Sequence, residues 1–250
     1  MPRGLRALPL VLLLVAGPSL AADARSAIDA YLARLAGTTL DDLVVEQAFT
    51  LYHPDGRHPA VRGTQRLLLK VGRAQRLEQT VDGQREVRLT VGDRLWVRQH
   101  DGRVAEASAA EARRDRVPLL TAFRRNADDL LAEWRTFGIR DDVTDEIRVR
   151  GRPVLIIGAR GPDRDRPAAW IDPEYGVIRF ITRERVGENL AVVDIVFSDH
   201  RPILDRFVYP YRQEMFADGK LVVVVAVHSV VANSRPPDPL FDPDVLKRGP

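Results

Sequence analysis

The chain has 250 residues, of which 45% are hydrophobic and 29% charged, so it is long enough for one sizeable core and is not disordered as a whole. It contains no cysteine, which excludes disulfide frameworks, thiolate metal sites, cysteine nucleophiles and a lipid-modified cysteine. The 38 basic and 35 acidic residues leave a formal charge of only +3. Because counterion-driven nucleic-acid binding needs a clustered basic excess, we expect no nucleic-acid partner.

Residues 1–21 have the pattern of a secretory signal peptide. Arg3 and Arg6 precede the apolar run Leu8–Ala16, and Gly17-Pro18 and the small residues up to Ala21 follow it. The apolar run is shorter than the roughly 20 residues that a membrane-spanning helix needs. We therefore expect export and cleavage after Ala21, which lowers the formal charge from +3 to +1 and leaves a single domain of residues 22–250.

The first half of this domain predicts one helix followed by antiparallel strands. Asp23 can cap a helix whose apolar face runs from Ile28 to Leu35, and Gly37 ends it. Alternation of apolar residues then predicts strands at residues 43–52, 66–71 and 87–91. The turn signals His53-Pro54-Asp55-Gly56, Asp82-Gly83 and Gly92-Asp93 are short, so they join antiparallel neighbours.

The second half predicts a helix and then seven more strands. Within residues 105–138, apolar residues at helical spacing from Leu119 to Trp134 predict an amphipathic helix that begins near Pro118. The strands are expected at residues 147–150, 154–158, 168–172, 177–183, 190–197, 207–213 and 221–231. Residues 177–181 and 221–227 are apolar on both faces, so both faces of those strands should be covered. We expect an α+β fold, mainly antiparallel β, with a sheet curled around a helical segment.

Motifs that carry chemistry are mostly absent. The sequence has no nucleophile elbow, dinucleotide-binding glycine pattern or phosphate-binding loop. Ser198, Asp199 and His200 are adjacent and cannot converge as a catalytic triad requires, while His53 and His58 fit an exposed hairpin tip better than a metal site. Acidic pairs such as Asp141-Asp142 stand beside arginines, as in solvated surfaces. We expect no catalytic residues, no metal and no cofactor.

Five segments, taken in chain order, resemble the superfamily of periplasmic lipoprotein-sorting carriers, the LolA- and LolB-like proteins with the related RseB-type sensors. They are the opening helix around Ala27–Leu32, the glycine-led strand Gly63–Arg73, the turn and tryptophan of Val91–Val97, the hairpin Ala169–Ile178 and the ending Pro237–Pro243. Their order carries the likeness more than any one segment does.

The resemblance implies a strongly curved, unclosed β-barrel whose concave face holds helices as a lid over an apolar cavity for acyl chains. It implies a periplasmic, non-enzymatic carrier of an acylated lipoprotein or lipid, with an inner-membrane transporter or an outer-membrane receptor as further partners. Carriers of this family also use an arginine under the lid, but the likeness assigns that role to no particular arginine here. Without a cysteine after the signal peptide, the chain does not resemble the membrane-anchored receptors.

Candidate ligand-binding residues are the apolar side chains of the predicted helix and one tryptophan of the strands, although all could equally be plain core. They are Leu119, Leu120, Phe123, Leu130, Leu131, Trp134 and Trp96. Two other functions stay open. One is a sensory module of the same fold that regulates a membrane partner, and the other is an enzyme acting on a lipid or glycan through Asp199 or His200.

Overall fold

The computed structural model describes residues 23–114, 126–161, 163–186 and 189–249. Its helical elements are α1 (Ala24–Leu35), α2 (Ala109–Arg114), α3 (Ala127–Thr136), the 3-10 helix η1 (Asp238–Phe241) and α4 (Pro243–Arg248). Its strands are β1 (Asp42–Tyr52), β2 (Pro59–Lys70), β3 (Ala74–Val81), β4 (Gln84–Val91), β5 (Arg94–Arg98), β6 (Val104–Glu106), β7 (Thr144–Val149), β8 (Arg152–Ile157), β9 (Ala168–Asp172), β10 (Gly176–Val186), β11 (Asn189–Leu204), β12 (Phe207–Ala217) and β13 (Lys220–Ala232).

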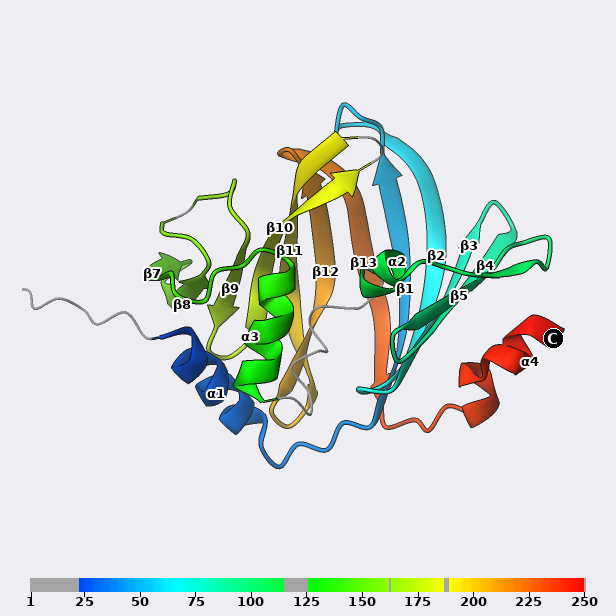
Figure 1. Ribbon diagram of the computed structural model, residues 1–250, viewed down its shortest axis with the longest axis horizontal. Helices are drawn as coiled ribbons and strands as arrows, with labels where there is room; N and C mark the ends of the chain where they lie inside the picture. Colours follow the sequence, from blue (N-terminus) through cyan, green and yellow to red (C-terminus); the bar gives the residue numbers. More distant parts are fainter. Residues whose placement is uncertain (1–22, 115–125, 162, 187–188, 250) are drawn as a thin grey trace, which may run out of the picture.

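All 13 strands form one antiparallel sheet in the order β6-β5-β4-β3-β2-β1-β13-β12-β11-β10-β9-β8-β7. Strands that follow one another in sequence lie side by side, except for β6 and β7, and the pairing of β1 with β13 joins the two halves of the chain. The sheet is curved, and β6 and β7 stand at its two separate edges, so the barrel is unclosed (Figure 1). The predicted α+β class with mainly antiparallel strands is confirmed.

The hairpins have a local cause in their turn residues. Asp82 and Gly83, between β3 and β4, both have a positive φ, of 49° and 77°. Asp218 and Gly219, between β12 and β13, repeat the pattern with 47° and 75°. Two successive left-handed residues match the right-handed twist of the flanking strands, and Asp and Gly are among the residues that adopt this conformation most readily.

Helices α1 and α3 lie against the concave face, in front of β8 to β11 (Figure 1). Asp23 caps α1 through its carboxylate, as expected, and Asn126 caps α3 by accepting a hydrogen bond from the backbone N–H of Asp129. One continuous helix from near Pro118 is therefore wrong, because Asn126 is extended and α3 begins after it. The residues before Asn126, 115–125, lie outside the described part of the chain.

The opposite, convex face is covered at one end by η1 and α4. Successive residues of β2 point to opposite faces, so Leu67 and Leu69 join the concave core while Leu68 packs beneath Phe241 and Leu246. In β10, Phe180 joins the concave core, while Ile178 packs in a separate cluster with Trp170. The sheet therefore has protein on both faces over part of its area.

Candidate functional site

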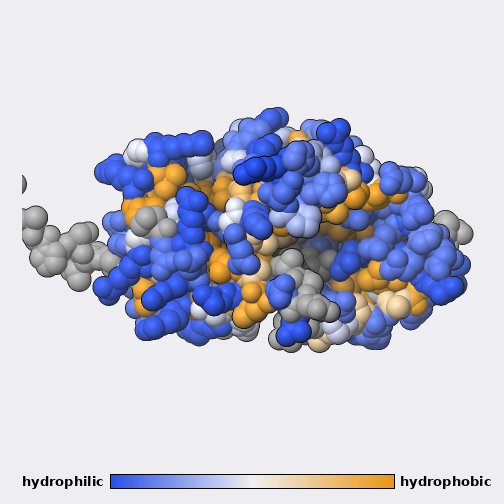
Figure 2. Space-filling model, turned by 90° about the horizontal axis from the view of Figure 1, so that it is seen from above, coloured by the Kyte–Doolittle hydropathy of each residue, from blue (hydrophilic) through white to orange (hydrophobic). Residues whose placement is uncertain are grey.

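The concave face carries a strip of apolar residues in the middle of the sheet, formed by Leu51, Met215, Val223 and Val225. The register pairs Leu51 with Val223 and Val223 with Met215, so these side chains point to the same side. None of them belongs to the buried clusters beneath α1 and α3. Leu51 is 36% exposed and the other three are half-buried. Viewed from above, the molecule is hollowed near its centre, with hydrophobic residues to either side (Figure 2).

A ladder of glutamine side chains crosses three strands beside this strip. Gln47 of β1 donates through Nε2 to Gln65 Oε1 at 2.8 Å, and Gln65 of β2 donates to Gln79 Oε1 of β3 at 2.8 Å. Gln47 is 8% exposed, and its Oε1 has no hydrogen-bond partner among the described residues. The ladder therefore adds a buried hydrogen-bond acceptor to an otherwise apolar wall.

Sequence reasoning missed these glutamines, although a signal for them was present. Leu43, Val45, Gln47 and Phe49 occupy alternate positions of β1 and are all buried. A glutamine at an inward-facing position of a strand is a buried polar group, which needs a hydrogen-bond partner in the protein or in a ligand.

The predicted ligand-binding residues divide into three groups by position. Leu130, Leu131 and Trp134 of α3 are buried in one cluster with residues of α1 and of β8 to β11. The ring of Trp134 meets the ring of Phe180 edge to face, with centroids 6.0 Å apart. Leu119, Leu120 and Phe123 lie outside the described residues.

Trp96 lies on the other side of the sheet. It pairs with Leu89 across β4 and β5 and packs with Leu68, Phe241 and Leu246 beneath the C-terminal helix. This position places Trp96 on the convex side of the sheet, away from the concave strip. Alternation along a strand shows which residues share a face, but it does not show which face is concave.

The adjacent residues Ser198, Asp199 and His200 form no triad. The carboxylate of Asp199 forms an ion pair with Arg201, with Oδ2 2.7 Å from Nη2, and the Asp199 backbone has a positive φ of 53°. His200 stacks on Tyr175 at a centroid distance of 4.6 Å, and burial lowers its pKa below the usual 6.5. Among the residues that the structure describes, no three His, Asp or Glu side chains converge as metal ligands. The described helices also include none that is long and apolar enough to cross a bilayer.

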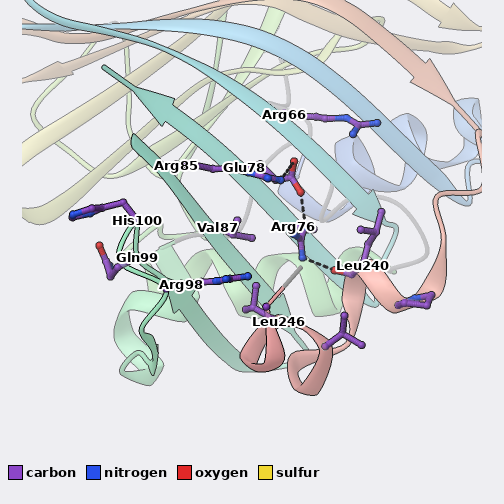
Figure 3. A pocket seen from close by; sticks show the side chains of 14 residues that line it. Arg66, Arg76, Glu78, Arg85, Val87, Arg98, Gln99, His100, Leu240 and Leu246 are labelled. Atoms are coloured by element: carbon purple, nitrogen blue, oxygen red, sulfur yellow. Dashed lines mark hydrogen bonds and ion pairs between the residues drawn. The ribbon is translucent and has the colours of Figure 1, made fainter. Parts of the chain in front are cut away.

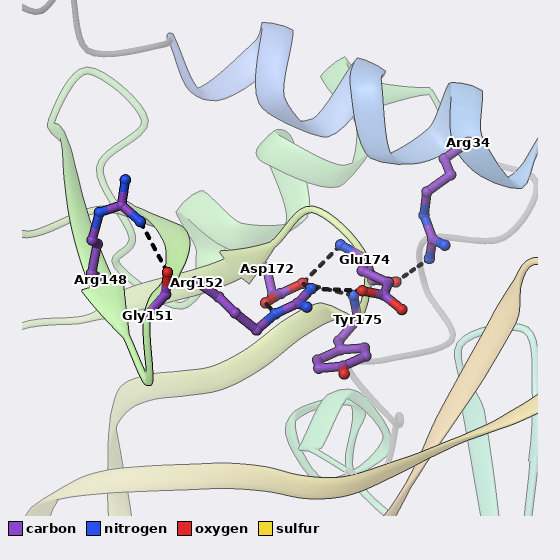
Figure 4. A network of polar contacts seen from close by, with 7 residues as sticks. All are labelled: Arg34, Arg148, Gly151, Arg152, Asp172, Glu174 and Tyr175. Atoms are coloured by element: carbon purple, nitrogen blue, oxygen red, sulfur yellow. Dashed lines mark hydrogen bonds and ion pairs between the residues drawn. The ribbon is translucent and has the colours of Figure 1, made fainter.

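The end of α1 is tied to the β9–β10 hairpin by a polar network (Figure 4). Arg34 of α1 donates to the backbone carbonyl of Glu174. Asp172, whose side chain is 3% exposed, accepts two hydrogen bonds from Arg152 at 2.7 and 2.8 Å and others from the backbone N–H groups of Glu174 and Tyr175. Burial raises the pKa of Asp172, but these hydrogen bonds lower it more, so the net pKa is below 3.8.

Replacing Asp172 with asparagine is expected to lower the free energy of unfolding by about 2 kcal/mol at neutral pH, because the charged partner of Arg152 is lost. Since the folded-state pKa is lowered, the stabilisation is present above the unfolded pKa and disappears as the pH falls through the folded value. The difference in unfolding free energy between wild type and variant should therefore become smaller below about pH 4. Urea denaturation at several pH values would measure it. Asp199→Asn, in an exposed pair, is the control and should change the free energy of unfolding far less than Asp172→Asn does. A difference in unfolding free energy that does not change with pH would contradict the role given to the Asp172 carboxylate.

No known family profile matches the chain, and no curated protein matches it. Three solved structures resemble it over most of its length. A domain assigned to outer membrane lipoprotein sorting, from Vibrio parahaemolyticus, has a TM-score of 0.59 and 14% identity over 90% of this chain and 100% of that chain. A DUF1329 family protein from Desulfovibrio piger has a TM-score of 0.58 and 14% identity, with the same coverage of 90% and 100%.

The third structure is a LolA superfamily protein from Nitrosomonas europaea, with a TM-score of 0.56 and 16% identity over 90% of this chain and 99% of that chain. Identities of 14 to 16% establish the fold alone. The expected resemblance is confirmed at that level, since the three structures match 90% of this chain with TM-scores of 0.56 to 0.59. The chain therefore has the LolA-like fold.

Proposed function

We propose that this protein is a periplasmic carrier that binds the acyl chains of a lipid or lipoprotein on the concave face of its sheet and moves this cargo toward the outer membrane. The observation that carries the proposal is the apolar strip of Leu51, Met215, Val223 and Val225, which is partly exposed although it faces the inside of the curve. Large apolar surfaces facing a hollow are typical of ligand sites. Two of the structural neighbours are named for lipoprotein sorting or for the LolA superfamily, which supports the same class of cargo.

Binding of this kind needs no catalytic group. Each methylene transferred from water to an apolar surface contributes about 0.8 kcal/mol, so contact with several methylenes gives useful affinity. The proposed site consists of the strip and of a lid with the apolar residues Leu119, Leu120, Phe123, Leu130, Leu131 and Trp134. The last three are packed against α1 and the sheet, so the lid would have to separate from that cluster to admit a ligand. Movement of such a lid would release the cargo. Residues 1–21 would direct export and be removed, and a membrane transporter or receptor would exchange the cargo.

Gln47 gives the site a polar element. Its Oε1, which has no partner among the described residues, would accept a hydrogen bond from an amide or hydroxyl near the head of an acylated ligand. An apolar wall with one well-placed acceptor is a common design of lipid-binding cavities, since burial supplies affinity and the acceptor fixes orientation.

Placing a charge on the concave strip is expected to weaken cargo binding strongly. Val225→Glu should weaken binding of a fluorescent fatty acid at least tenfold, because a carboxylate in an apolar site must be desolvated. Val231→Glu is the matched control. It lies on the same strand β13 but pairs with Val44 on the convex side and is 50% exposed, so binding should stay within about twofold of wild type.

Native mass spectrometry of protein expressed to the periplasm, followed by lipid extraction, would identify the cargo. We expect an acyl-bearing species with wild type and Val231→Glu and none with Val225→Glu. Equal binding by the two variants, with both folded by circular dichroism, would contradict the proposed site. A protein without bound lipid even after incubation with lipids and lipopeptides would contradict the carrier function, and crosslinking to a membrane protein would then favour the sensory module.

A further inference from the structure

A cavity lies on the convex face, between β2–β5 and the C-terminal segment (Figure 3). It has a volume of about 470 Å³, and the sheet separates it from the concave strip. Its walls combine guanidinium groups with apolar side chains of η1 and α4. The lining includes Arg66, Arg76, Glu78, Arg85, Arg98 and Leu240.

The strand register builds the cationic wall. Arg66, Glu78, Val87 and Arg98 are consecutive partners across β2, β3, β4 and β5, so their side chains form one row on the convex face. The next row, with Arg76 between Leu68 and Leu89, borders the apolar core beneath α4. The C-terminal segment thus covers the apolar row and leaves the charged row open to the cavity.

The carboxylate of Glu78 forms ion pairs with two of the arginines. Glu78 Oε1 lies 2.7 Å from Arg76 Nε, and Oε2 lies 2.9 Å from Arg85 Nη2. Arg76 also donates to the backbone carbonyl of Leu240 at 3.0 Å, which fixes its guanidinium against the C-terminal segment. The side chains of Arg76 and Glu78 are only 11% and 14% exposed, so this part of the wall is rigid and partly desolvated. Burial raises the pKa of Glu78, but Arg76 and Arg85 lower it more, so its pKa is lowered and it stays ionised.

The cavity keeps a surplus of positive charge. Among the described residues, four arginines and one glutamate line it, and Arg66 and Arg98, unlike Arg76 and Arg85, have no hydrogen bond or ion pair within that part of the chain. Glu46 stands across from Arg66 on β1, but it is exposed and is not part of the lining. In a chain whose total formal charge is only +3, holding several guanidinium groups around one cavity is unfavourable unless an anion offsets their repulsion.

We propose that this convex cavity binds a phosphate group, either as free phosphate or as the headgroup of an anionic lipid. The fork of N–H donors on a guanidinium matches phosphate oxygens. Arg66 and Arg98, which have no hydrogen bond or ion pair among the described residues, supply such donors from the two ends of one row. The part of the ligand next to the phosphate would contact an apolar wall of Val87, Leu240 and Leu246. Because the cavity lies on the other face of the sheet, this proposal stands independently of acyl binding on the concave strip.

The test compares a double variant, Arg66→Gln with Arg98→Gln, with a charge-matched control, Arg160→Gln with Arg164→Gln. The control residues are exposed, lie in the segment between β8 and β9, and do not line the cavity. Titration calorimetry with inorganic phosphate, and flotation with phosphatidylcholine vesicles with and without phosphatidylglycerol, would measure binding by the mature protein. We expect saturable binding to weaken at least tenfold in the cavity variant and less than twofold in the control.

The two probes distinguish the source of the phosphate. Binding of inorganic phosphate supports a free phosphate ligand, and binding only to vesicles with phosphatidylglycerol supports a lipid headgroup. Arg98→Lys keeps the charge but loses the forked N–H donors of the guanidinium. It should bind the phosphate probe with intermediate affinity and have the same free energy of unfolding as wild type. Absence of saturable binding with both probes, or equal weakening in the cavity variant and the control, would overturn the proposal without affecting acyl binding.

Discussion

Trp134→Ala is expected to lower the free energy of unfolding by about 4 kcal/mol, the largest loss that we expect from a change in α3. Trp134 is 2% exposed and fills the space between α3 and the concave face, where it contacts Phe180 edge to face. Removing the indole leaves a cavity that the rigid sheet cannot close, and it removes an aromatic pair as well. Urea denaturation would measure the loss.

Amide hydrogen exchange would show which part of the Trp134→Ala variant loses stability. The amides of α3 should lose protection first, because the helix is short and most of its stability comes from the face that Trp134 buries. Ala132→Gln is the control on the exposed side of the same helix and should change stability by less than about 0.5 kcal/mol. A loss of less than about 1 kcal/mol for Trp134→Ala would mean that α3 is not anchored through this residue.

Asp194→Ala is expected to cost about 4 kcal/mol as well, by a different mechanism. Asp194 of β11 and Arg179 of β10 form a two-point ion pair, with Oδ1 2.7 Å from Nε, and each side chain is 11% exposed. Arg179 also lies over the ring of Trp170, 4.8 Å from its centroid. Removing the carboxylate leaves a guanidinium that is buried without its counter-charge, and the cost of that state exceeds the value of the original pair.

A second variant separates charge from packing. Replacing both partners, with Arg179→Met and Asp194→Leu, removes the buried charges together and should recover most of the stability lost in Asp194→Ala. Chemical denaturation of the wild type, the single variant and the double variant gives the comparison. A double variant as unstable as the single one would show that packing, and not the unpaired charge, sets the cost.

Local features of the sequence determined most of the strands and their turns. The alternation of apolar residues in β1 and β2, and the Asp-Gly pairs before β4 and β13, are properties of neighbouring residues, so they could be recognised without any knowledge of the rest of the chain. The same holds for α1, whose capping residue Asp23 and apolar face are both local. The start of α3 could not be placed this way, because apolar spacing continued past the cap at Asn126.

The tertiary structure alone decided how these elements combine. The pairing of β1 with β13 joins Leu43 to Ala232, and nothing near either residue specifies the other, because long-range pairing depends on the total area that the whole sheet buries. The same folding decided that Trp96 lies under α4 and not on the concave face. It also brought Arg66, Glu78 and Arg98, from three different strands, into one row. Alternation tells which residues of a strand share a face, but only register and curvature determine what that face meets.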